Sequence, residues 1–487
     1  MKTQPVIPFN NSFSQLSLPF CSPQHPSPVP LPKLIRLNTS LLKELGLDAN
    51  WLGSQQGLEM LSGNTLPENA TPIASVYAGH QFGNWNPQLG DGRAILLGEV
   101  IAPGNGLRYD IQLKGAGQTP YSRNGDGRSP LGPVLREYLV SEAMHALGIP
   151  TTRSLAAVSS GDSVLRESAL PGGILTRVAQ SHIRIGSFEF FSARRETNSV
   201  KALADYVIKR HYPSSLSADH PYLDLLDNVI TQQAQLIARW QSVGFIHGVM
   251  NTDNMLVCGE TVDYGPCAFM DTYHPDTVFS SIDHAGRYAY GNQPSIAQWN
   301  LSWLAQSLLP LLDDDETKAV ALAQQALNGY IVKYTDAYNE TMLKKLGLKP
   351  ETPVNQMLLQ NFLDLLTKEQ CDFTLAFRYL AENLNPREPV TPGIQDFFRL
   401  PEAFTPWLNQ WRTQVQRENT DMATVQTQLL STNPVFIPRN HLVEEAIQSA
   451  YTKNDLRLFN SLVDLLEKPF DYRPDKKKYA LPPRPEQ

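Results

Sequence analysis

The sequence predicts an α+β fold in two lobes, and three observations carry this prediction. A strand-like segment ending in Lys114 is followed by a helix-like segment containing Glu137. Later, His247 and Asn254 keep a seven-residue spacing, and an Asp-Tyr-Gly triplet begins at Asp263. Towards the C-terminus, apolar residues recur at three- and four-residue steps, as in amphipathic helices. This order of motifs is that of protein kinases, so we expect a protein-kinase-like fold with an N-terminal arm and a largely helical C-terminal extension.

Composition excludes several classes of protein. The chain has 487 residues, of which 41% are hydrophobic and 18% charged, as in ordinary globular proteins. A net charge of -7 argues against a nucleic-acid partner. The four cysteines lack paired spacing, so we expect neither a zinc site nor a disulfide framework, and a cytoplasmic location. No apolar run is long enough to predict a membrane-spanning helix.

Residues 1–70 are expected to form an N-terminal arm and a first helix. Residues 1–33 contain eight prolines and no continuous apolar region, which predicts an extended surface segment and no secretory signal. The segment Leu37–Leu47 has amphipathic spacing, with Thr39 or Ser40 as the expected N-cap.

Residues 71–200 are expected to form a kinase-like N-lobe with nucleotide-binding loops. Tyr77–Val100 contains five glycines in a turn-rich run that ends in a predicted strand, Ala94–Leu97. Glycines allow the backbone to approach phosphate closely. Neither a Walker motif nor a complete GxGxxG is present, and a hairpin with tight turns accounts for the local pattern without any ligand.

Lys114 lies at the end of an alternating segment, Arg108–Gly117, that reads as a strand. The segment Val134–Gly148 reads as a helix, with Glu137 near its start. In kinases a strand lysine grips the phosphates and a helix glutamate fixes that lysine. Taken alone, Glu137 would be an ordinary surface charge of a helix, so its role depends on Lys114.

Gly172–Phe190 interleaves strand-like apolar residues with Arg177, His182 and Arg184. Arginine forks suit phosphate oxygens, and the two arginines near an ATP site would clamp the terminal phosphate. A surface salt bridge remains the simpler interpretation of either arginine by itself.

Residues 201–300 are expected to form the C-lobe with its catalytic and metal-binding loops. In the kinase order, Asn254 and Asp263 would hold magnesium. Val249 occupies the base position and cannot take a proton, which leaves Asp253 as the available carboxylate of the loop. Met255–Val257 is expected to be a short strand. Turn chemistry alone is the open alternative for this stretch.

Residues 301–487 are expected to form a helical C-terminal region. Four segments show helical spacing: WNLSWLAQSLLPLL, ETKAVALAQQALNGYIVKY, VNQMLLQNFLDLLTK and RLFNSLVDLLEKPF. The tail from Asp471 is expected to be irregular and solvated.

Three strings carry a resemblance to a known family: YAGHQFGNWNPQLGDGRA, KGAGQTPYSRNGDGRSPLGPVLREYLVSEAMHALGIPTTR and HGVMNTDNM with DYGPCAFMD. Across most of its length the chain resembles the bacterial branch of the selenoprotein O family of pseudokinases. The resemblance implies a kinase-like fold that binds ATP in reversed orientation. It also implies transfer of AMP to Ser, Thr or Tyr hydroxyls of proteins, with magnesium as cofactor and pyrophosphate as product.

Carried over residue by residue, the resemblance implies that Asp253 is the base and that Glu137 pairs with Lys114. It implies Asn254 and Asp263 as metal ligands. The nucleotide contacts that it implies are Gly90, Gly92, Arg93, Lys114, Asp126, Gly127, Arg177, Arg184 and Asp263. Some family members carry a cysteine or selenocysteine near the C-terminus, whereas the last cysteine here is Cys371, which puts redox control by the tail in doubt.

Three alternatives stay open at this point. The first is UMP transfer with manganese, a variant of the same chemistry. The second is a true kinase, against which Val249 counts. The third is a non-catalytic ATP-binding scaffold, which would have no need for Asp253, Asn254 and Asp263 together. The expected partners are protein substrates, with no nucleic acid and no membrane.

Overall fold

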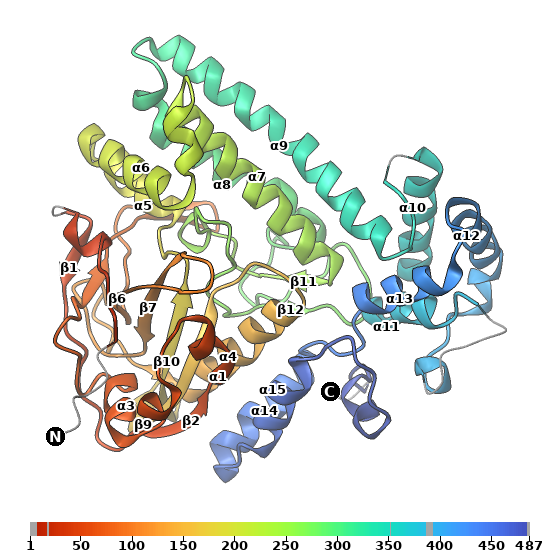
Figure 1. Cartoon of the computed structure of the whole chain (residues 1–487), viewed down its shortest axis with the longest axis horizontal. Helices are drawn as coiled ribbons and strands as arrows, with labels where there is room; N and C mark the ends of the chain where they lie inside the picture. Colours follow the sequence, from red (N-terminus) through yellow and green to blue (C-terminus); the bar gives the residue numbers. More distant parts are fainter. Residues whose placement is uncertain (1–6, 17–18, 351, 386–392, 485–487) are drawn as a thin grey trace.

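The computed structural model describes residues 7–16, 19–350, 352–385 and 393–484. An antiparallel sheet forms one side of the molecule, and long helices form the other (Figure 1). This arrangement confirms the predicted α+β class.

The large sheet places two of the predicted phosphate-binding cations, Lys114 and Arg177, on its central strands. Lys114 is paired with Ala94 on one side and with Leu175 on the other, and Arg177 lies opposite Gln112. In the described residues the strand order is β1 (Cys21–Pro23), β3 (Ile73–Ser75), β6 (Ala94–Ile101), β7 (Arg108–Lys114), β10 (Ala169–Ala179), β9 (Arg153–Leu165) and β2 (Lys33–Leu37), and β8 (Ser129–Pro130) pairs with β10.

The two faces of the sheet are covered by different helices. Ile111 and Leu113 of β7 belong to a core shared with α1 (Thr39–Glu44), α2 (Ala49–Leu52) and α3 (Gln55–Leu61). Side chains alternate along a strand, so Gln112 and Lys114 belong to the opposite face, which α4 (Leu131–Ala146) covers. The predicted alternation along this strand is therefore confirmed.

The N-terminal segment differs from the predicted surface arm. Phe13, Phe20 and Val29 are buried, and β1 and β2 extend the sheet at its two edges. The first helix is capped by Asn38, whose side chain accepts from the Leu41 N–H, and not by Thr39 or Ser40. The first six residues of the predicted arm lie outside the described residues.

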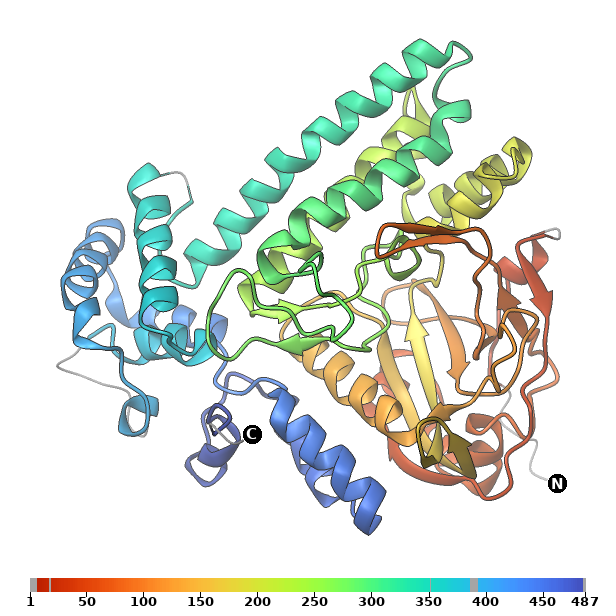
Figure 2. The same cartoon turned by 180° about the vertical axis from the view of Figure 1, so that it is seen from behind.

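Helix α4 lies between the sheet and two C-terminal helices, α14 (Asn440–Lys453) and α15 (Arg457–Leu466). Figure 2 shows this pair running beside α4. The Gly132 N–H donates to the Tyr451 hydroxyl at 2.8 Å, and Arg136 donates to the Asn440 side chain at 3.1 Å. The last helices of the chain thus hold the helix that carries Glu137.

The remaining helices form two groups. Helices α5 (Ile185–Ser192), α6 (Thr197–His211), α7 (Pro221–Ser242), α8 (Gln293–Leu312) and α9 (Glu316–Lys344) pack on one another. Helices α10 (Pro353–Lys368), α11 (Phe373–Glu382), α12 (Thr405–Glu418) and α13 (Met422–Thr432) share a second core. All four segments with helical spacing are confirmed as helices, in α8, α9, α10 and α15.

Short elements complete the chain. Two hairpins pair β4 (Gly79–Gln81) with β5 (Asn84–Asn86) and β11 (Phe245–Ile246) with β12 (Ala268–Phe269). The 3-10 turns span Phe13–Gln15, Pro213–Ser217, Thr252–Asn254, Tyr290–Asn292, Ile394–Asp396, Glu402–Phe404 and Pro474–Tyr479.

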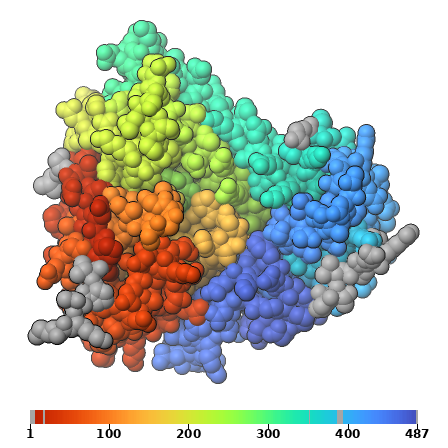
Figure 3. All heavy atoms as spheres, in the orientation of Figure 1, coloured from red at the N-terminus to blue at the C-terminus, as the bar shows by residue number. Residues whose placement is uncertain are grey.

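The predicted solvated tail is wrong in part. Ala480 is fully buried, and its carbonyl accepts from Arg439 Nε at 2.9 Å. Arg439 is itself buried and also bonds Asp271 and Asp372, so the tail completes a buried polar cluster. Figure 3 shows the C-terminal residues, in blue, as part of one continuous surface with the sheet half. In the described part of the chain no helix is both long and apolar enough to cross a membrane.

Candidate active site

The predicted site residues meet at one cavity of about 450 Å³ beside the central strands. It lies between the sheet, the loop around Gly125 and the loops next to β11 and β12. The predicted residues that line it are Gly90, Gly92, Arg93, Lys114, Asp126, Gly127, Glu137, Arg177, Arg184, Asp253, Asn254 and Asp263.

A buried ion cluster forms the floor of this cavity. Lys114 Nζ lies 2.6 Å from Glu137 Oε2 and 2.9 Å from Asp263 Oδ1. Arg177 bonds Glu137 and lies 2.8 Å from Asp263 Oδ1, while Arg184 lies 2.7 Å from Asp263 Oδ2. Three cations therefore share two carboxylates, and the cluster keeps an excess positive charge.

The cluster sets the ionisation of its members. Burial alone would raise the pKa of Asp263, but Lys114, Arg177 and Arg184 outweigh it and hold that pKa well below its ordinary value. Burial and the neighbouring Arg177 lower the pKa of Lys114, against the attraction of both carboxylates. Asp263 also has a left-handed backbone, with φ of 64°, which aspartate adopts more readily than most residues other than glycine.

Asp253 occupies the 3-10 turn Thr252–Asn254 and faces the same cavity. Its Oδ2 accepts from Gln81 Nε2 at 3.0 Å, and its buried Oδ1 has no hydrogen-bond partner among the described residues. Burial raises the pKa of Asp253 to about 6, although Arg184 and Gln81 favour the charged form. A carboxyl group with this pKa and one free oxygen is suited to accept a proton near neutral pH.

Backbone contacts fix the loop that carries Asp253. His247 is fully buried, and its Nε2 donates to the Val262 carbonyl at 2.9 Å, which ties this loop to the residue before Asp263. The predicted strand Met255–Val257 is wrong. This segment makes only an isolated bridge, between Leu256 and Arg184, because its backbone holds the Arg184 segment instead of a neighbouring strand.

The donor set fits a hard divalent cation. The Asn254 Nδ2–H donates to the Val249 carbonyl at 2.9 Å, which leaves its Oδ1 for a metal, and Asp263 adds carboxylate oxygens. Magnesium prefers such oxygens and takes its other ligands from water and substrate phosphates. Within the described ranges no group of three or more His, Cys, Asp or Glu is placed to hold a metal ion.

Close packing also requires glycine in the predicted phosphate loop, because a side chain there would clash with its neighbours. A Cβ at Gly90 would lie 2.5 Å from the Tyr121 ring, and one at Gly92 would lie 2.7 Å from the Tyr121 carbonyl. Gly127, with φ of 64°, packs on Gly117, and a Cβ at Gly127 would clash with the Gly117 carbonyl. The loop that contains Gly127 therefore lies directly on the glycine-rich segment, and both loops line the cavity.

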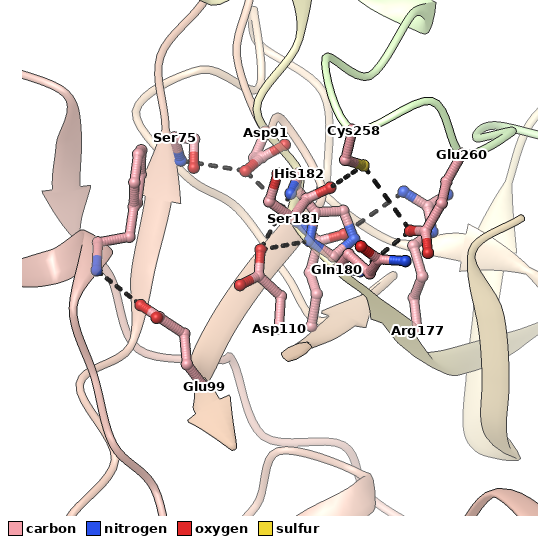
Figure 4. A network of polar contacts seen from close by, with 12 residues as sticks. Ser75, Asp91, Glu99, Asp110, Arg177, Gln180, Ser181, His182, Cys258 and Glu260 are labelled. Carbon is pink, nitrogen blue, oxygen red and sulfur yellow. Dashed lines mark hydrogen bonds and ion pairs between the residues drawn. The ribbon is translucent and has the colours of Figure 1, made fainter. Parts of the chain in front are cut away.

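A second layer of polar contacts holds the strands beneath the site (Figure 4). Asp110 of β7 accepts from the backbone and from the ring of His182, at 3.0 Å each, and from Arg210 at 2.7 Å. His182 lies two residues before Arg184, so these contacts fix the segment that brings Arg184 to Asp263.

Several residues at or next to the cavity were not predicted. Gln81 was missed because its contact with Asp253 arises only when the β4–β5 hairpin packs on the loop of Asp253. Tyr77 lies under Arg184, with 4.7 Å between the guanidinium carbon and the ring centroid. Arg123 also lines the cavity and was not predicted.

The charge of the cavity favours a polyanion. Among the described residues, seven cations and five carboxylates line it: Arg93, Lys114, Arg123, Arg128, Arg166, Arg177 and Arg184 with Asp91, Asp126, Glu137, Asp253 and Asp263. Of the predicted nucleotide contacts, Asp126 is already bound by Arg166, at 2.8 and 3.0 Å.

A family model described as protein adenylyltransferase SelO matches residues 6–467. The chain belongs to the SelO family. A relative named protein nucleotidyltransferase YdiU, from Bradyrhizobium diazoefficiens, is 54% identical over 481 residues, which cover 99% of this chain and 97% of the relative. The protein of the same name from Methylorubrum extorquens is 53% identical over 483 residues, covering 98% and 97%.

Membership of the SelO family confirms the predicted family and the predicted enzyme class. The chain is a nucleotidyltransferase. The cavity of this SelO family member therefore has the charge of a nucleotide site and a carboxyl group suited to proton transfer.

Proposed function

We propose that the protein transfers AMP from ATP to Ser, Thr or Tyr hydroxyls of other proteins, with ATP in reversed orientation and pyrophosphate as the leaving group. The observation that carries the proposal is the position of the buried cations Lys114, Arg177 and Arg184, which surround Asp263 on the floor of a cavity that also contains Asp253. Cations at this depth would draw the terminal phosphates inward. The α-phosphorus would then lie nearer to Asp253.

In this scheme the acceptor hydroxyl attacks the α-phosphorus. A bond forms between the hydroxyl oxygen and phosphorus, the bond to the β-phosphate oxygen breaks, and pyrophosphate leaves. The proton of the hydroxyl goes to the free Oδ1 of Asp253, a contribution to the rate of roughly 10²- to 10⁴-fold. Lys114, Arg177 and Arg184 stabilise the negative charge that develops on pyrophosphate.

Asn254 and Asp263 are the residues that would hold magnesium, or manganese in its place. A bound divalent cation would offset the negative charge of the phosphates. The role of Glu137 is to position Lys114 and Arg177, because it bonds both.

The proposed architecture is a kinase-like two-lobed fold. It is supported by the strand-to-helix pair Lys114–Glu137 and by the Asp253 and Asp263 loops beside the β11–β12 hairpin. We place the N-lobe at residues 71–200 and the C-lobe at 201–300, with 1–70 as the arm and 301–487 as the helical region. A cytoplasmic location, without nucleic-acid or membrane partners, remains part of the proposal.

The test is incubation of the purified protein with magnesium and ATP labelled at the α or the γ position. Label from the α position on the protein or on an added substrate, absent in Asp253→Asn, is the expected result. Label from the γ position alone would overturn the proposal in favour of a kinase. Nucleotide binding without transfer of any label would indicate a non-catalytic ATP-binding scaffold.

The same assay separates AMP from UMP. α-Labelled UTP with manganese is run beside α-labelled ATP with magnesium, and faster incorporation from ATP is expected. Asp253→Asn is nearly isosteric, so a thermal melt that matches the parent protein shows that any loss of transfer is chemical.

A further inference from the structure

The β4–β5 hairpin has two faces with different surroundings. Gln81 on one face donates to Asp253, and a Cβ at Gly79 would lie 2.8 Å from the same carboxyl group. His80 and Trp85 are directly cross-strand partners. Because side chains alternate along a strand, these two project to the opposite face. The hairpin therefore forms a wall between the candidate base and whatever lies behind it.

Behind that wall lies a second cavity, of about 360 Å³. Its floor is His80 and Glu189, both buried, and its rim includes Trp85, Trp303 and Gln306. The His80 ring stacks on Trp303 with 3.7 Å between centroids and lies 4.8 Å from the Trp85 ring. Trp85 is 40% exposed, an unusual exposure for so large an apolar side chain.

The floor of this cavity is acidic and incompletely bonded. Glu189 Oε1 lies 2.6 Å from His80 Nδ1, while Oε2 has no hydrogen-bond partner among the described residues. Trp303 Nε1 is likewise unpartnered there. No lysine or arginine is among the described residues that line the cavity.

The same aromatic cluster already holds one guanidinium outside the cavity. Arg287 lies over Trp299 at 4.5 Å, and Trp299 contacts both His80 and Trp303. Indole faces attract cations, and burial raises the pKa of Glu189 to about 7, so a cation bound beside it would favour its charged form. The charge and the walls of the cavity are therefore complementary to a basic side chain.

We propose that this cavity, with Trp85, Trp303 and Glu189 as its recognition residues, binds a lysine or arginine side chain of the protein substrate. The proposal rests on the proposed function, since it assumes a protein acceptor. The acceptor hydroxyl lies on the Asp253 face of the hairpin and the basic side chain on the other face. An extended chain advances about 3.3 Å per residue, and stacked sheets lie about 10 Å apart, so at least roughly three residues separate the two across the hairpin.

Binding of two labelled peptides tests the proposal independently of transfer. Both contain one serine and differ only three residues away, where one has arginine and the other has citrulline, its uncharged isostere. Fluorescence anisotropy with the full chain is expected to give about tenfold tighter binding of the arginine peptide, the size of a well-formed cation–aromatic contact. Trp85→Ala and Glu189→Gln should bring this ratio close to one.

Met357→Ala serves as the control, because Met357 is an exposed apolar residue of α10 outside both cavities, and it should keep the parent ratio. Equal binding of the two peptides by the parent protein, or a ratio unchanged in Trp85→Ala, would overturn the docking site. α-Label transfer from ATP is followed in the same samples. Label without an arginine preference removes the docking site alone, and an arginine preference without label removes the transfer reaction alone.

Discussion

Asp253 is held between opposing influences at the scale of single atoms. Burial raises its pKa to about 6, while Arg184 and the amide of Gln81 favour the carboxylate. Its ionisation thus depends on a residue of a different segment, since Gln81 belongs to the β4–β5 hairpin.

The first prediction concerns pH. A general base must be deprotonated, so the rate of AMP transfer should fall as pH decreases through about 6 and level off above it. Gln81→Leu removes a hydrogen bond that favours the charged form, so the pKa of Asp253 should rise and the acid limb should move to higher pH. Rates of α-label transfer across the pH range locate the acid limb in the parent protein and in the variant. An acid limb at the same pH in parent and variant would refute the role given to Gln81.

The second prediction concerns space beside Asp253. A Cβ at Gly79 would lie 2.8 Å from Asp253 Oδ1 and 3.0 Å from Asp253 Cβ. Gly79→Ala should therefore displace the carboxyl group and lower transfer by roughly tenfold or more, since small misplacements of a reacting group are costly. Gly104→Ala, where a Cβ meets nothing within 4 Å, is the matched control. Equal rates for the two variants would show that Gly79 does not limit the position of Asp253.

At this scale the sequence predicted the charged residues on the floor of the cavity. Lys114, Glu137 and Asp263 were found because kinase-like order constrains their spacing, and the structure brings them within ion-pair distance. Gln81 and Tyr77 could not be found in this way, because their contacts arise from packing of segments far apart in the chain. The catalytic and binding roles of all these residues stay predictions.

At the scale of elements, α4 is the piece on which the candidate site depends. It carries Glu137 towards the sheet and is covered on its other side by α14 and α15. A Cβ at Gly132, in its first turn, would lie 2.4 Å from the Tyr451 hydroxyl and 2.8 Å from Ile447 Cγ2.

The third prediction compares two glycines within helices. Gly132→Ala should lower the free energy of unfolding by roughly 1–3 kcal/mol, as overpacking does. Gly329→Ala, within α9, should raise it by about 0.5–1 kcal/mol, because the nearest atom to the new Cβ is 3.9 Å away and alanine is the better helix former. Urea unfolding of the two variants measures both changes. A rise in the free energy of unfolding for Gly132→Ala would contradict the contact of α14 with α4.

Helices with strong periodicity of apolar residues were predictable from the sequence. Strands that form only by pairing with distant segments were not. The helical spacing of WNLSWLAQSLLPLL and RLFNSLVDLLEKPF reflects local burial, so α8 and α15 were found. Strands β1 and β2 lie in a proline-rich stretch and exist because the sheet offers an edge to them. Met255–Val257 has strand-like composition, but its backbone bonds the Arg184 segment.

At the scale of the whole molecule, both ends of the described chain return to the sheet half. Strands β1 and β2 close its edges, and α14 and α15 cover α4 (Figures 1 and 2). The fold class was predictable from the kinase-like order of motifs, whereas this convergence depends on contacts between residues more than 300 positions apart, such as Gly132 and Tyr451.

The fourth prediction is that a chain lacking residues 440–487 loses nucleotide binding. Its α4 would expose the apolar surface that α14 and α15 now cover, and Arg439 would lose the Ala480 carbonyl. In the full chain, ATP with magnesium at 100 times its Kd should stabilise the protein by about 2.7 kcal/mol. The shortened chain should show no such shift in a thermal melt. A full shift would show that α4 holds Glu137 without this cover.

The packing of α14 and α15 on α4 also determines the order in which parts of the molecule can fold during synthesis. The ribosome completes the sheet and the loop of Asp263 long before it reaches residues 440–466, so a nascent chain exposes an apolar helix surface for the time needed to add about 300 residues. Chaperones that bind exposed apolar segments would have their longest opportunity in this interval. The ion cluster around Asp263 would become rigid only after α14 and α15 have packed on α4, so transfer activity should begin after that step.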